Sequence, residues 1–577
     1  MESPRSSEGQ RKVNDAGALV LSVALERLEM RDWNSQKTSL AERLSAGHQH
    51  ASGKMVALTD LQALLEAVLR PGDRVCLEGD NQKQADLLAG ALAAVDVSKV
   101  HDLHMVQSGV VLPEHLDVFE RGVAKRLDYS YSGPQSARIA KMLFGGKIEL
   151  GAVHTYLELF ARYFIDLTPH VALIAAVSAD RDGNLYTGPN TEDTPTVVEA
   201  TAFKNGVVIA QVNEIVDKVP RVDIPGDRVH FVVKADKPFF VEPLFTRDPG
   251  AITEGQILTA MLAIKGIYAP YGVKRLNHGI GFNTAAIELL LPTYGERLGL
   301  KGKVATRFAL NPHPALIPAI ESGWVEQIHS FGSEVGMDDY IHARSDIFFT
   351  GADGSLRSNR AFCQVAGLYA CDMFIGSTLQ IDLQGNSSTV TASRIAGFGG
   401  APNMGSDAGG RRHPSEPWLQ AGKEADPDGP APLRRGRKLV VQIGETFGDK
   451  NIPLFVEKLD ALTLAEKLKL ELAPVMIYGD DVTHIVTEEG IANLLLCRDK
   501  DEREQAIRGV AGYTDVGRGR DAKMVQRLRA RGVIRRPEDL EIDPLDADRS
   551  LLAARSVKDL VHWSGGLYAP PSKFRNW

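Results

Sequence analysis

Strand-like and helix-like segments alternate along this chain from about Met55, and this alternation constrains the fold more than any other feature. The run VALIAAVSA (Val171–Ala179) is apolar throughout, which is typical of a strand buried on both faces. The segment NQKQADLLAGALAAV (Asn81–Val95) has apolar residues at steps of three and four, which indicates a helix. This pattern predicts βαβ units, and therefore an α/β fold with a mainly parallel sheet.

The same alternation starts again near Pro249, so we expect two α/β domains, each an open, mainly parallel sheet flanked by helices. Their predicted ranges are 51–245 and 246–577. Within the second range, residues 403–438 are rich in glycine, proline and charge, and they predict a long surface loop.

Residues 1–50 are predicted to be a flexible N-terminal extension. The apolar run Ala16–Leu25 follows basic residues, as in a signal peptide, but no small-residue cleavage site comes after it. A loosely attached helix fits this run better, and so does an upstream start, with Met30 as the alternative first residue. Whether the native protein contains residues 1–29 is left open.

The composition narrows the class of protein. The chain has 577 residues and a net charge of −8, whereas a nucleic-acid-binding protein needs a basic surface. No apolar run reaches the ~18 residues of a membrane-spanning helix. The four cysteines form no C-x-x-C pair, and the histidines show no metal-ligand spacing. We therefore expect a cytoplasmic protein that binds no metal, membrane or nucleic acid.

Three turns that carry glycine or asparagine follow predicted strands: EGDNQKQ, TGPNTED and NHGIGFN. Ligands bind outside the carboxyl ends of strands in open α/β sheets, and free N–H groups in such turns attract anions. Taken singly, each turn is as readily an ordinary connection, and the incomplete G-x-G-x-x-G argues against a dinucleotide site. The candidate binding residues in these turns are Gly79, Asp80, Asn81, Asn190, Asn277, His278, Gly279 and Gly281.

A fourth turn, RIAGFGGAPNM (Arg394–Met404), has three glycines within four positions. One glycine is enough for a tight turn, so three indicate a backbone that approaches a ligand closely. The candidates in the glycine loop are Gly397, Phe398, Gly399 and Gly400. Three further candidates flank the loop: Arg394, Ala401 and Asn403.

The block STLQIDLQGNSSTVTASRIAGFGGAPN resembles the strand, turn and glycine loop of the class I coenzyme A transferases. LNHGIGFNTAAI resembles the G-I-G turn that opens their second domain, and VTEEGIANLL resembles a segment near their C-terminus. These blocks appear in the family's order. From about Met30 to Trp577 the chain resembles the malonate decarboxylase α-subunit family, with PGDRVCLEGDNQKQAD, DGNLYTGPNTEDTPT and SVKDLVHWSGGLY as characteristic stretches.

This resemblance implies a transferase subunit that exchanges acetyl for malonyl on the thiol of a phosphoribosyl-dephospho-CoA arm. The arm belongs to an acyl-carrier-protein subunit, so this chain is expected to hold no cofactor, and CoA stays open as a ligand. The implied partners are the carrier protein and the decarboxylase subunits, with malonate, acetate and their thioesters as reactants. Two alternatives remain: an acetyl-CoA:dicarboxylate CoA-transferase of malonate or citrate type, and a non-catalytic scaffold that docks the carrier.

One departure from the class I pattern affects the implied mechanism. Those enzymes form a covalent thioester on a glutamate, but the corresponding stretch here, Thr306–Pro314, contains no Asp or Glu. Glu334 in GSEVG resembles the nucleophile motif, yet it lies downstream of the family's position. A direct exchange through a mixed acetyl–malonyl anhydride follows as the hypothesis. Such a route needs positioning, exclusion of water and stabilisation of an oxyanion.

Roles can be assigned to the candidates on this hypothesis. Backbone N–H groups of Gly397, Phe398, Gly399 and Gly400 are the predicted oxyanion donors. Asn311, with His313, takes the place of the missing glutamate and is predicted to orient the substrate; turn chemistry beside the prolines is the alternative. The second carboxylate of malonate needs cationic or N–H partners, for which the candidates are Arg394, Asn277 and His278. The basic run Arg434, Arg435, Arg437 and Lys438 predicts contact with phosphates or an acidic carrier, or else a solvated surface.

Overall fold

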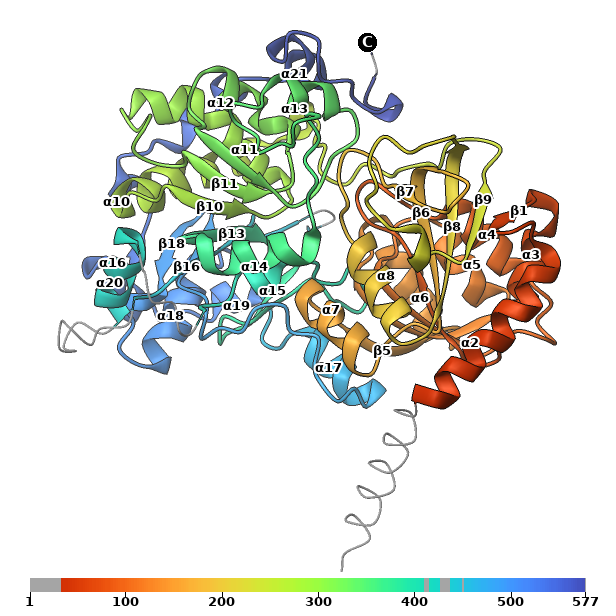
Figure 1. Ribbon diagram of the computed structural model, residues 1–577. Helices are drawn as coiled ribbons and strands as arrows, with labels where there is room; N and C mark the ends of the chain where they lie inside the picture. The colour runs from red at the N-terminus through yellow and green to blue at the C-terminus, as the bar shows by residue number, and fades with distance from the viewer. Residues whose placement is uncertain (1–32, 409–414, 426–435, 449–450, 576) are drawn as a thin grey trace, which may run out of the picture.

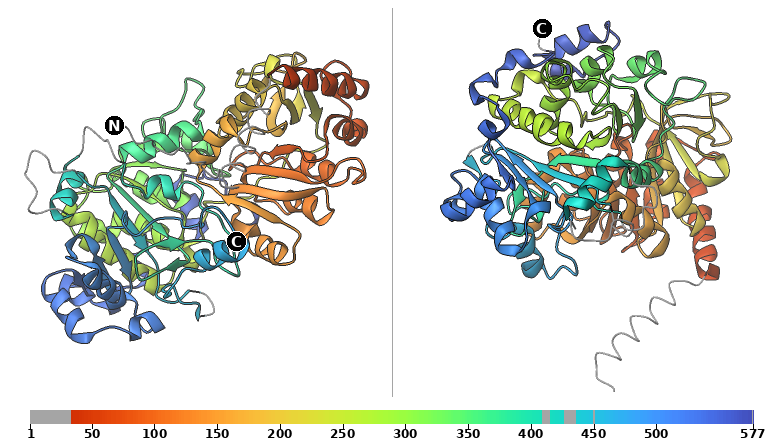
Figure 2. Two further views of the ribbon diagram at one scale, coloured as in Figure 1. Left: turned by 90° about the horizontal axis from the view of Figure 1, so that it is seen from below. Right: turned by 90° about the vertical axis from the view of Figure 1, so that its left-hand side faces the viewer.

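The computed structural model describes residues 33–408, 415–425, 436–448, 451–575 and 577. Two α/β domains lie side by side in it, one drawn red to yellow and the other green to blue (Figure 1). All strands of the first sheet come before residue 245 and all strands of the second come after it. Figure 2 shows the same two-lobed arrangement from below.

The first sheet has the strand order β1-β9-β8-β6-β2-β3-β4-β5 within the described residues, with β7 antiparallel to β6 and every other pair parallel. The predicted mainly parallel sheet is therefore confirmed for this domain. Its strands are β1 (Met55–Val56), β2 (Arg74–Leu77), β3 (Leu103–Gly109), β4 (Ala124–Tyr131), β5 (Glu149–Val153), β6 (Val171–Ala179), β7 (Leu185–Tyr186), β8 (Val207–Ile215) and β9 (Phe231–Lys234).

Helices cover both faces of this sheet (Figure 1). In β6, Leu173 and Ala175 belong to one hydrophobic core while Ile174 and Ala176 belong to the other. A strand buried on both sides needs an apolar residue at every position, which explains the unbroken run of VALIAAVSA. The helices of this domain are α2 (Trp33–Gly47), α3 (Leu61–Val68), α4 (Asp86–Ala93), α5 (Glu114–Glu120), α6 (Ser136–Phe144), α7 (Tyr156–Ile165) and α8 (Thr194–Phe203).

The second sheet has the order β12-β11-β10-β13-β16-β17-β18-β19, and its pairs are parallel as far as β17. The last two pairs, β17 with β18 and β18 with β19, are antiparallel. The strands are β10 (Arg275–His278), β11 (Arg307–Leu310), β12 (Gln327–Ser330), β13 (Met373–Ser377), β16 (Leu439–Ile443), β17 (His484–Thr487), β18 (Gly490–Asn493) and β19 (Ile534–Arg535), with β14 (Gln380–Ile381) and β15 (Ser387–Ser388) as a separate hairpin.

Alternate residues of β13 also divide between two cores, since Met373 and Ile375 pack on one side and Phe374 on the other. The second sheet is therefore also flanked by helices, as predicted. The described helices are α9 (Glu254–Ala263), α10 (Ala269–Tyr271), α11 (Phe282–Leu290), α12 (Ile317–Glu321), α13 (Asp338–Ala343), α14 (Arg360–Ala370), α15 (Ala401–Met404), α16 (Glu416–Ala425), α17 (Asp460–Leu468), α18 (Lys500–Val510), α19 (Asp515–Arg518), α20 (Ala522–Ala530) and α21 (Val557–Trp563).

The prediction of a flexible extension over residues 1–50 is wrong for its second part. Residues 1–32 lie outside the described residues, but α2 is a helix attached to the first domain. Arg43 of α2 is buried, and its guanidinium donates to Asp73 at 2.9 Å and to the carbonyl of Val68 at 2.8 Å. A buried ion pair with these extra hydrogen bonds holds the helix in place.

The predicted long loop at residues 403–438 is also corrected where the structure describes it. Helix α16 lies within this range, because Trp418 and Ala421 give it an apolar face that is buried against the second domain. Lys438, from the predicted solvated basic run, is fully buried just before β16. Arg434 and Arg435 lie outside the described residues.

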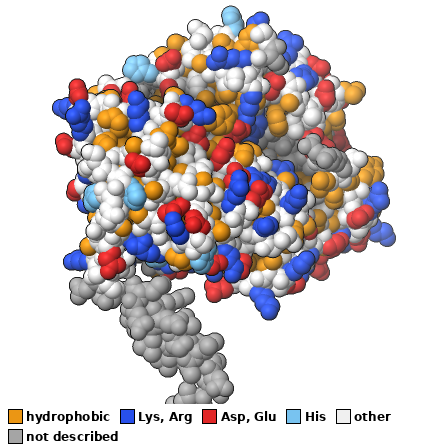
Figure 3. Space-filling model, turned by 90° about the vertical axis from the view of Figure 1, so that its right-hand side faces the viewer, with side chains coloured by type: hydrophobic (Ala, Val, Ile, Leu, Met, Phe, Trp, Pro, Cys, Tyr) orange, Lys and Arg blue, Asp and Glu red, His pale blue; other side chains and the backbone are white. Residues whose placement is uncertain are grey.

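The described residues also bear on the expectations about membranes, nucleic acids and metal ions. Among the described residues, no helix combines the length and the apolarity needed to span a bilayer. On the face drawn in Figure 3, acidic and basic side chains are interspersed. The same residues contain no group of His, Cys, Asp and Glu side chains arranged to hold a metal ion.

Candidate active site

A cavity of about 120 Å³ lies between the two domains. It is bounded by residues at or just beyond the carboxyl ends of β2, β4, β10 and β11, the position where open α/β sheets bind ligands. Three of the four strand-end turns that the sequence singles out contribute residues to its wall; the TGPNTED turn does not. The predicted site residues in its wall are Asn81, Asn277, His278, Gly279, Asn311, Phe398, Gly399, Gly400 and Ala401.

The glycine loop needs its three glycines for different reasons. Gly397 and Gly399 have φ values of 76° and 58°, in the left-handed region that side chains disfavour. Gly397 also passes close to the first domain, because a Cβ added there would lie 2.3 Å from the carbonyl oxygen of Ser130. At Gly400 an added Cβ would meet the side-chain amide of Gln364 at 2.5 Å. The loop is therefore pressed between the end of β4 and helix α14.

Not all of the N–H groups in this loop are free to bind a ligand. The N–H groups of Phe398 and Gly399 both donate to the carbonyl of Ser130, at 2.6 and 2.9 Å. This corrects the prediction that these two act as oxyanion donors, because each already has a partner. Within the described part of the chain the Gly400 N–H has no hydrogen-bond partner, and Gly400 lines the cavity. Gly400 is therefore the remaining candidate donor at this cavity.

A second polar group in the cavity wall is the amide of Asn311. It follows β11 and is only 9% exposed, and its Nδ2 has no hydrogen-bond partner among the described residues. Asn277 differs, because its Nδ2 already donates to the carbonyl of Ala309 at 2.5 Å. A buried donor without a partner is costly unless a ligand or water satisfies it. Asn311 therefore fits its predicted role as a ligand donor better than Asn277 does.

Two histidines of the wall share one buried carboxylate. Glu288 Oε1 lies 2.9 Å from Nδ1 of both His278 and His313. Burial raises the pKa of Glu288, but His313 and the hydrogen bonds from both histidines outweigh it and lower the pKa. An ionised carboxylate can only accept, so the Nδ1 atom of each histidine is assigned as the donor. The hydroxyl of Tyr268 lies 2.9 Å from the other ring nitrogen of His278, its Nε2. His313 also lines the cavity, and since its Nδ1 pairs with Glu288, its Nε2 is the ring nitrogen that remains for a ligand.

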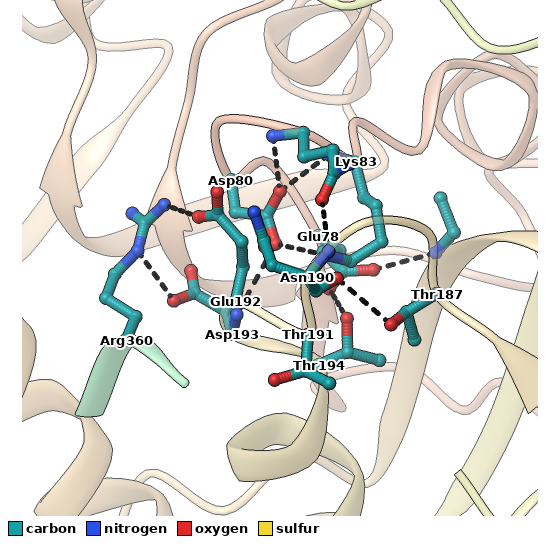
Figure 4. Close-up of polar contacts among 12 residues, drawn as sticks. Glu78, Asp80, Lys83, Thr187, Asn190, Thr191, Glu192, Asp193, Thr194 and Arg360 are labelled. Carbon is teal, nitrogen blue, oxygen red and sulfur yellow. Dashed lines mark hydrogen bonds and ion pairs between the residues drawn. The ribbon is translucent and has the colours of Figure 1, made fainter. Parts of the chain in front are cut away.

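The principal cation of the cavity is Arg360, which the sequence reasoning missed. It is the first residue of α14, is 2% exposed and lies with its guanidinium 4.7 Å from the ring centre of Tyr156. Its Nε is 3.1 Å from Asp193 Oδ1, and its Nη2 contacts Glu192 (Figure 4). A cation is unfavourable at the N-terminus of a helix. An arginine at the start of a predicted helix is therefore the sequence signal that could have identified Arg360 as a functional residue.

Behind Arg360 lies a cluster of buried charges, the acid cluster, formed by Glu78, Asp80, Glu192 and Asp193 with Lys83 (Figure 4). Lys83 is 3.1 Å from Asp80. Four carboxyl groups face only two cations here, so full ionisation would leave an excess of negative charge. Burial, with further repulsion from Asp80, raises the pKa of Glu78 to about 8 and that of Glu192 to about 7.

Several predicted binding residues lie behind the cavity wall instead of in it. Gly79 is explained by backbone packing, since an added Cβ would lie 2.3 Å from the carbonyl oxygen of Gly109. Asp80 is buried in the acid cluster, and Asn403 donates to Gln364 at 3.2 Å. Predicted direct contacts of these residues with a ligand are therefore not supported. Asn190 and Gly281 are also absent from the cavity wall.

The surroundings of Glu334, the alternative nucleophile, indicate a structural role. Glu334 is 1% exposed and does not line the cavity. Its carboxylate accepts hydrogen bonds from the N–H groups of Leu244, Phe245 and Thr246 and from the Thr246 hydroxyl, at 2.6 to 3.3 Å. Those residues join the two domains, so we interpret Glu334 as the anchor of this connection.

Arg394 does not reach the inner cavity, contrary to its predicted role beside malonate. It lines a separate cleft of about 460 Å³, the outer cleft, together with Gly397. Four residues, Tyr131, Ile280, Phe398 and Ala401, belong to both spaces, which are therefore neighbours.

Two open α/β domains that close on one cavity with a glycine loop in its wall define a protein of the coenzyme A transferase-like fold. A putative citrate lyase α subunit from Streptococcus mutans shares this fold with a TM-score of 0.56 at 16% identity, over 79% of this chain and 82% of that one. The model of the family "Malonate decarboxylase, alpha subunit, transporter" matches residues 32–577. The chain belongs to the malonate decarboxylase α-subunit family.

Two closer relatives agree with this membership. A Malonomonas rubra protein named acetyl-S-ACP:malonate ACP transferase is 62% identical over 548 residues, which are 94% of this chain and 99% of that protein. A chain from a Pseudomonas malonate decarboxylase hetero-tetramer, solved in complex with malonate, is 58% identical with a TM-score of 0.91. That match covers 95% of this chain and 100% of the Pseudomonas chain.

Proposed function

We propose that this chain is an acetyl-S-ACP:malonate ACP transferase, which exchanges acetyl for malonyl on the thiol of an acyl carrier protein. The composition of the cavity wall is the observation that supports direct transfer through a mixed anhydride, without a glutamyl thioester. Among the described residues, no Asp or Glu side chain lines the cavity, while Gly400, Asn311 and Arg360 all do. A covalent glutamyl thioester needs a carboxylate at the reacting centre, and anhydride exchange needs only binding groups.

The exchange then takes two acyl-transfer steps. A carboxylate oxygen of malonate attacks the carbonyl carbon of the acetyl thioester, the C–S bond breaks, and a mixed anhydride and a thiolate result. The thiolate attacks the malonyl carbonyl of the anhydride, and acetate leaves. Arg360 binds the malonate carboxylate that does not react, and the Gly400 N–H and Asn311 amide stabilise the oxyanion of each step.

The anhydride must be protected from hydrolysis. Phe245, Phe331, Phe374 and Met404 contribute apolar surface to the cavity wall, and the cavity lies between the two domains. An apolar enclosure excludes competing water and strengthens the polar contacts inside it. The role of the protein is thus to hold reactants together, because the exchange of one thioester for another is nearly isoenergetic.

The direct assay follows the label of [¹⁴C]malonate. Incubation of the purified chain with acetyl-loaded carrier protein is expected to yield labelled carrier and free acetate in equal amounts. Unlabelled carrier after complete incubation would contradict the transferase, and would favour a docking scaffold. Replacing the carrier by acetyl-CoA tests the alternative of a free CoA-transferase, which turns over acetyl-CoA at least as well.

Glu334→Gln separates a structural glutamate from a nucleophile. We expect the variant to retain the transfer rate and to lose about 1–3 kcal/mol of the free energy of unfolding, because glutamine replaces one of the two acceptor oxygens with an NH2 group that cannot accept from the buried N–H donors. Chemical denaturation and the labelled-malonate assay measure the two effects. Borohydride treatment during turnover should give no glutamate-derived alcohol; such a product at Glu334 would restore the covalent route.

Malonate binding is expected to weaken as the pH rises through about 7 to 8. In this window Glu192 and Glu78, whose pKa values are raised to about 7 and about 8, lose their protons in the folded protein. Each lost proton adds negative charge behind Arg360 and opposes a dianionic ligand. Calorimetric titration with malonate from pH 6 to 9 measures the effect, and Glu78→Gln should remove its upper part. Affinity independent of pH would contradict this account.

The assembly proposed for this chain includes an acyl-carrier-protein subunit and decarboxylase subunits, as the relative from Pseudomonas comes from a hetero-tetramer. Co-purification of the co-expressed subunits tests this. The thiol that reacts belongs to the carrier's arm, so the chain itself is proposed to need no bound cofactor. Its cytoplasmic location stays a prediction.

A further inference from the structure

The outer cleft opens beside the inner cavity and has a different character. Its volume is about 460 Å³, against about 120 Å³ for the inner cavity. Tyr131, Ile280, Phe398 and Ala401 line both spaces, so these four residues form the boundary between them. A ligand longer than malonate can therefore have its reacting end in the inner cavity and its remainder in the outer cleft.

Two arginines of the outer cleft have no carboxylate partner among the described residues. Arg247 is half-buried and anchored, because its Nη1 donates to the carbonyls of Leu244 and Thr246 at 3.0 and 2.9 Å. Arg394 is exposed, and only its Nε has a side-chain partner, the hydroxyl of Ser136 at 3.3 Å. The Nη2 atoms of both guanidinium groups are left without a hydrogen-bond acceptor in the described structure.

The other charged side chains of the cleft do not cancel these arginines. Lys573 forms an ion pair with Glu242, and both line the cleft. Three cations and one carboxylate therefore surround it, which leaves an excess of positive charge. The buried hydroxyl of Ser377 in the same wall also lacks a hydrogen-bond partner within the described residues. Guanidinium and hydroxyl donors in one cleft match a phosphate group.

We propose that the outer cleft binds the phosphate groups of the pantetheine thioester that donates the acetyl group, with Arg247 and Arg394 as the phosphate-binding residues. This inference rests on the proposed function, because a thioester reacting at Gly400 must extend away from the inner cavity. The boundary at Phe398 and Ala401 is the path for the uncharged pantetheine segment. The same phosphate chemistry occurs on a carrier-bound arm and on free CoA.

Binding is measured with two probes that differ only in a phosphate, 4′-phosphopantetheine and pantetheine. The wild-type chain is expected to bind phosphopantetheine about tenfold or more tightly, as charge-assisted hydrogen bonds to a phosphate require. Arg247→Gln/Arg394→Gln should remove this preference and leave the affinity for pantetheine unchanged. Equal binding of the two probes by the wild type, or no binding of either, overturns the proposal.

Arg181→Gln is the matched control, because Arg181 is an exposed arginine of the first domain that lines neither space. It removes one positive charge and should keep the full preference for phosphopantetheine. If the double variant does not fold, the single variant Arg394→Gln, which alters an exposed side chain, tests the same loss of preference for phosphopantetheine. A preference that persists in Arg394→Gln and in Arg247→Gln alike also overturns the proposal.

Turnover distinguishes the two sources of phosphate and separates this inference from the proposed function. With acetyl-loaded carrier as donor, the double variant should show a KM for the carrier raised about tenfold or more and a kcat close to that of the wild type. The same change with acetyl-CoA alone would assign the cleft to free CoA. Absence of transfer by the wild type refutes the proposed function, whereas unchanged kinetics of the double variant refute only the role of the cleft.

Discussion

Replacing Gly400 by proline is expected to lower the rate constant of acyl transfer by about 10²–10³, the usual cost of one oxyanion donor. Proline removes the N–H group, and in the described structure that group is the one in the glycine loop that lines the inner cavity without a partner. The backbone can accept the change, because φ of Gly400 is −89°, near the range of proline. Single-turnover transfer from acetyl-loaded carrier measures the effect.

Gly400→Ala is the control for this substitution. Alanine and proline both add a Cβ, which would meet the amide of Gln364 at 2.5 Å, but alanine keeps the N–H group. The contact is with the end of a flexible side chain, so both variants should fold. A much smaller loss in Gly400→Ala than in Gly400→Pro identifies the N–H group as the donor. Equal losses would show instead that the space beside Gln364 matters and that the N–H does not.

Arg360→Lys is expected to raise the KM for malonate about 10- to 100-fold. Lysine keeps the positive charge between Glu192 and Asp193 but loses the planar, multiple donors that an arginine offers to a carboxylate. The charge balance of the acid cluster is preserved, so the free energy of unfolding should fall only slightly. Initial rates at varied malonate and fixed carrier give the KM, and chemical denaturation gives the stability.

Arg360→Gln gives a contrasting result, because it leaves two buried carboxylates without their cation. Loss of one partner of a buried ion pair costs about 3–5 kcal/mol of folding free energy. Arg221→Lys is the matched control: Arg221 is a half-buried arginine paired with Asp223 and Asp353 that lines neither the cavity nor the outer cleft. A wild-type KM in Arg360→Lys would mean that Arg360 only balances the acid cluster and does not bind malonate.

Much of the fold was predictable, because the signals for it are local. The unbroken apolar run Val171–Ala179 indicates a strand buried on both faces, and the structure confirms it as β6. Helix α2 and helix α16 were not predicted, because their burial depends on partners elsewhere in the fold. Arg43 pairs with Asp73, and Trp418 is buried against the second domain, so neither segment shows its attachment in its own composition.

The parts of the candidate site that lie at the ends of strands were predictable from the sequence. The carboxyl ends of β2, β10 and β11 meet at one cavity, so Asn81, Asn277 and Asn311 come together as expected. Gly79 could not be assigned correctly, since a glycine that touches a ligand and a glycine that touches Gly109 give the same sequence pattern. The glycine loop likewise meets Ser130, a residue of the other domain.

The sequence by itself determined the two α/β domains, the family and the absence of a glutamate at the usual nucleophile position, because periodicity and motif order are properties of the chain. Only the tertiary structure decided which N–H groups of the glycine loop are free, and that Arg360 is the cation of the cavity. Both depend on contacts between distant residues: Ser130 accepts from Phe398, and Glu192 lies 168 residues from Arg360. Such contacts arise when the two domains close on each other.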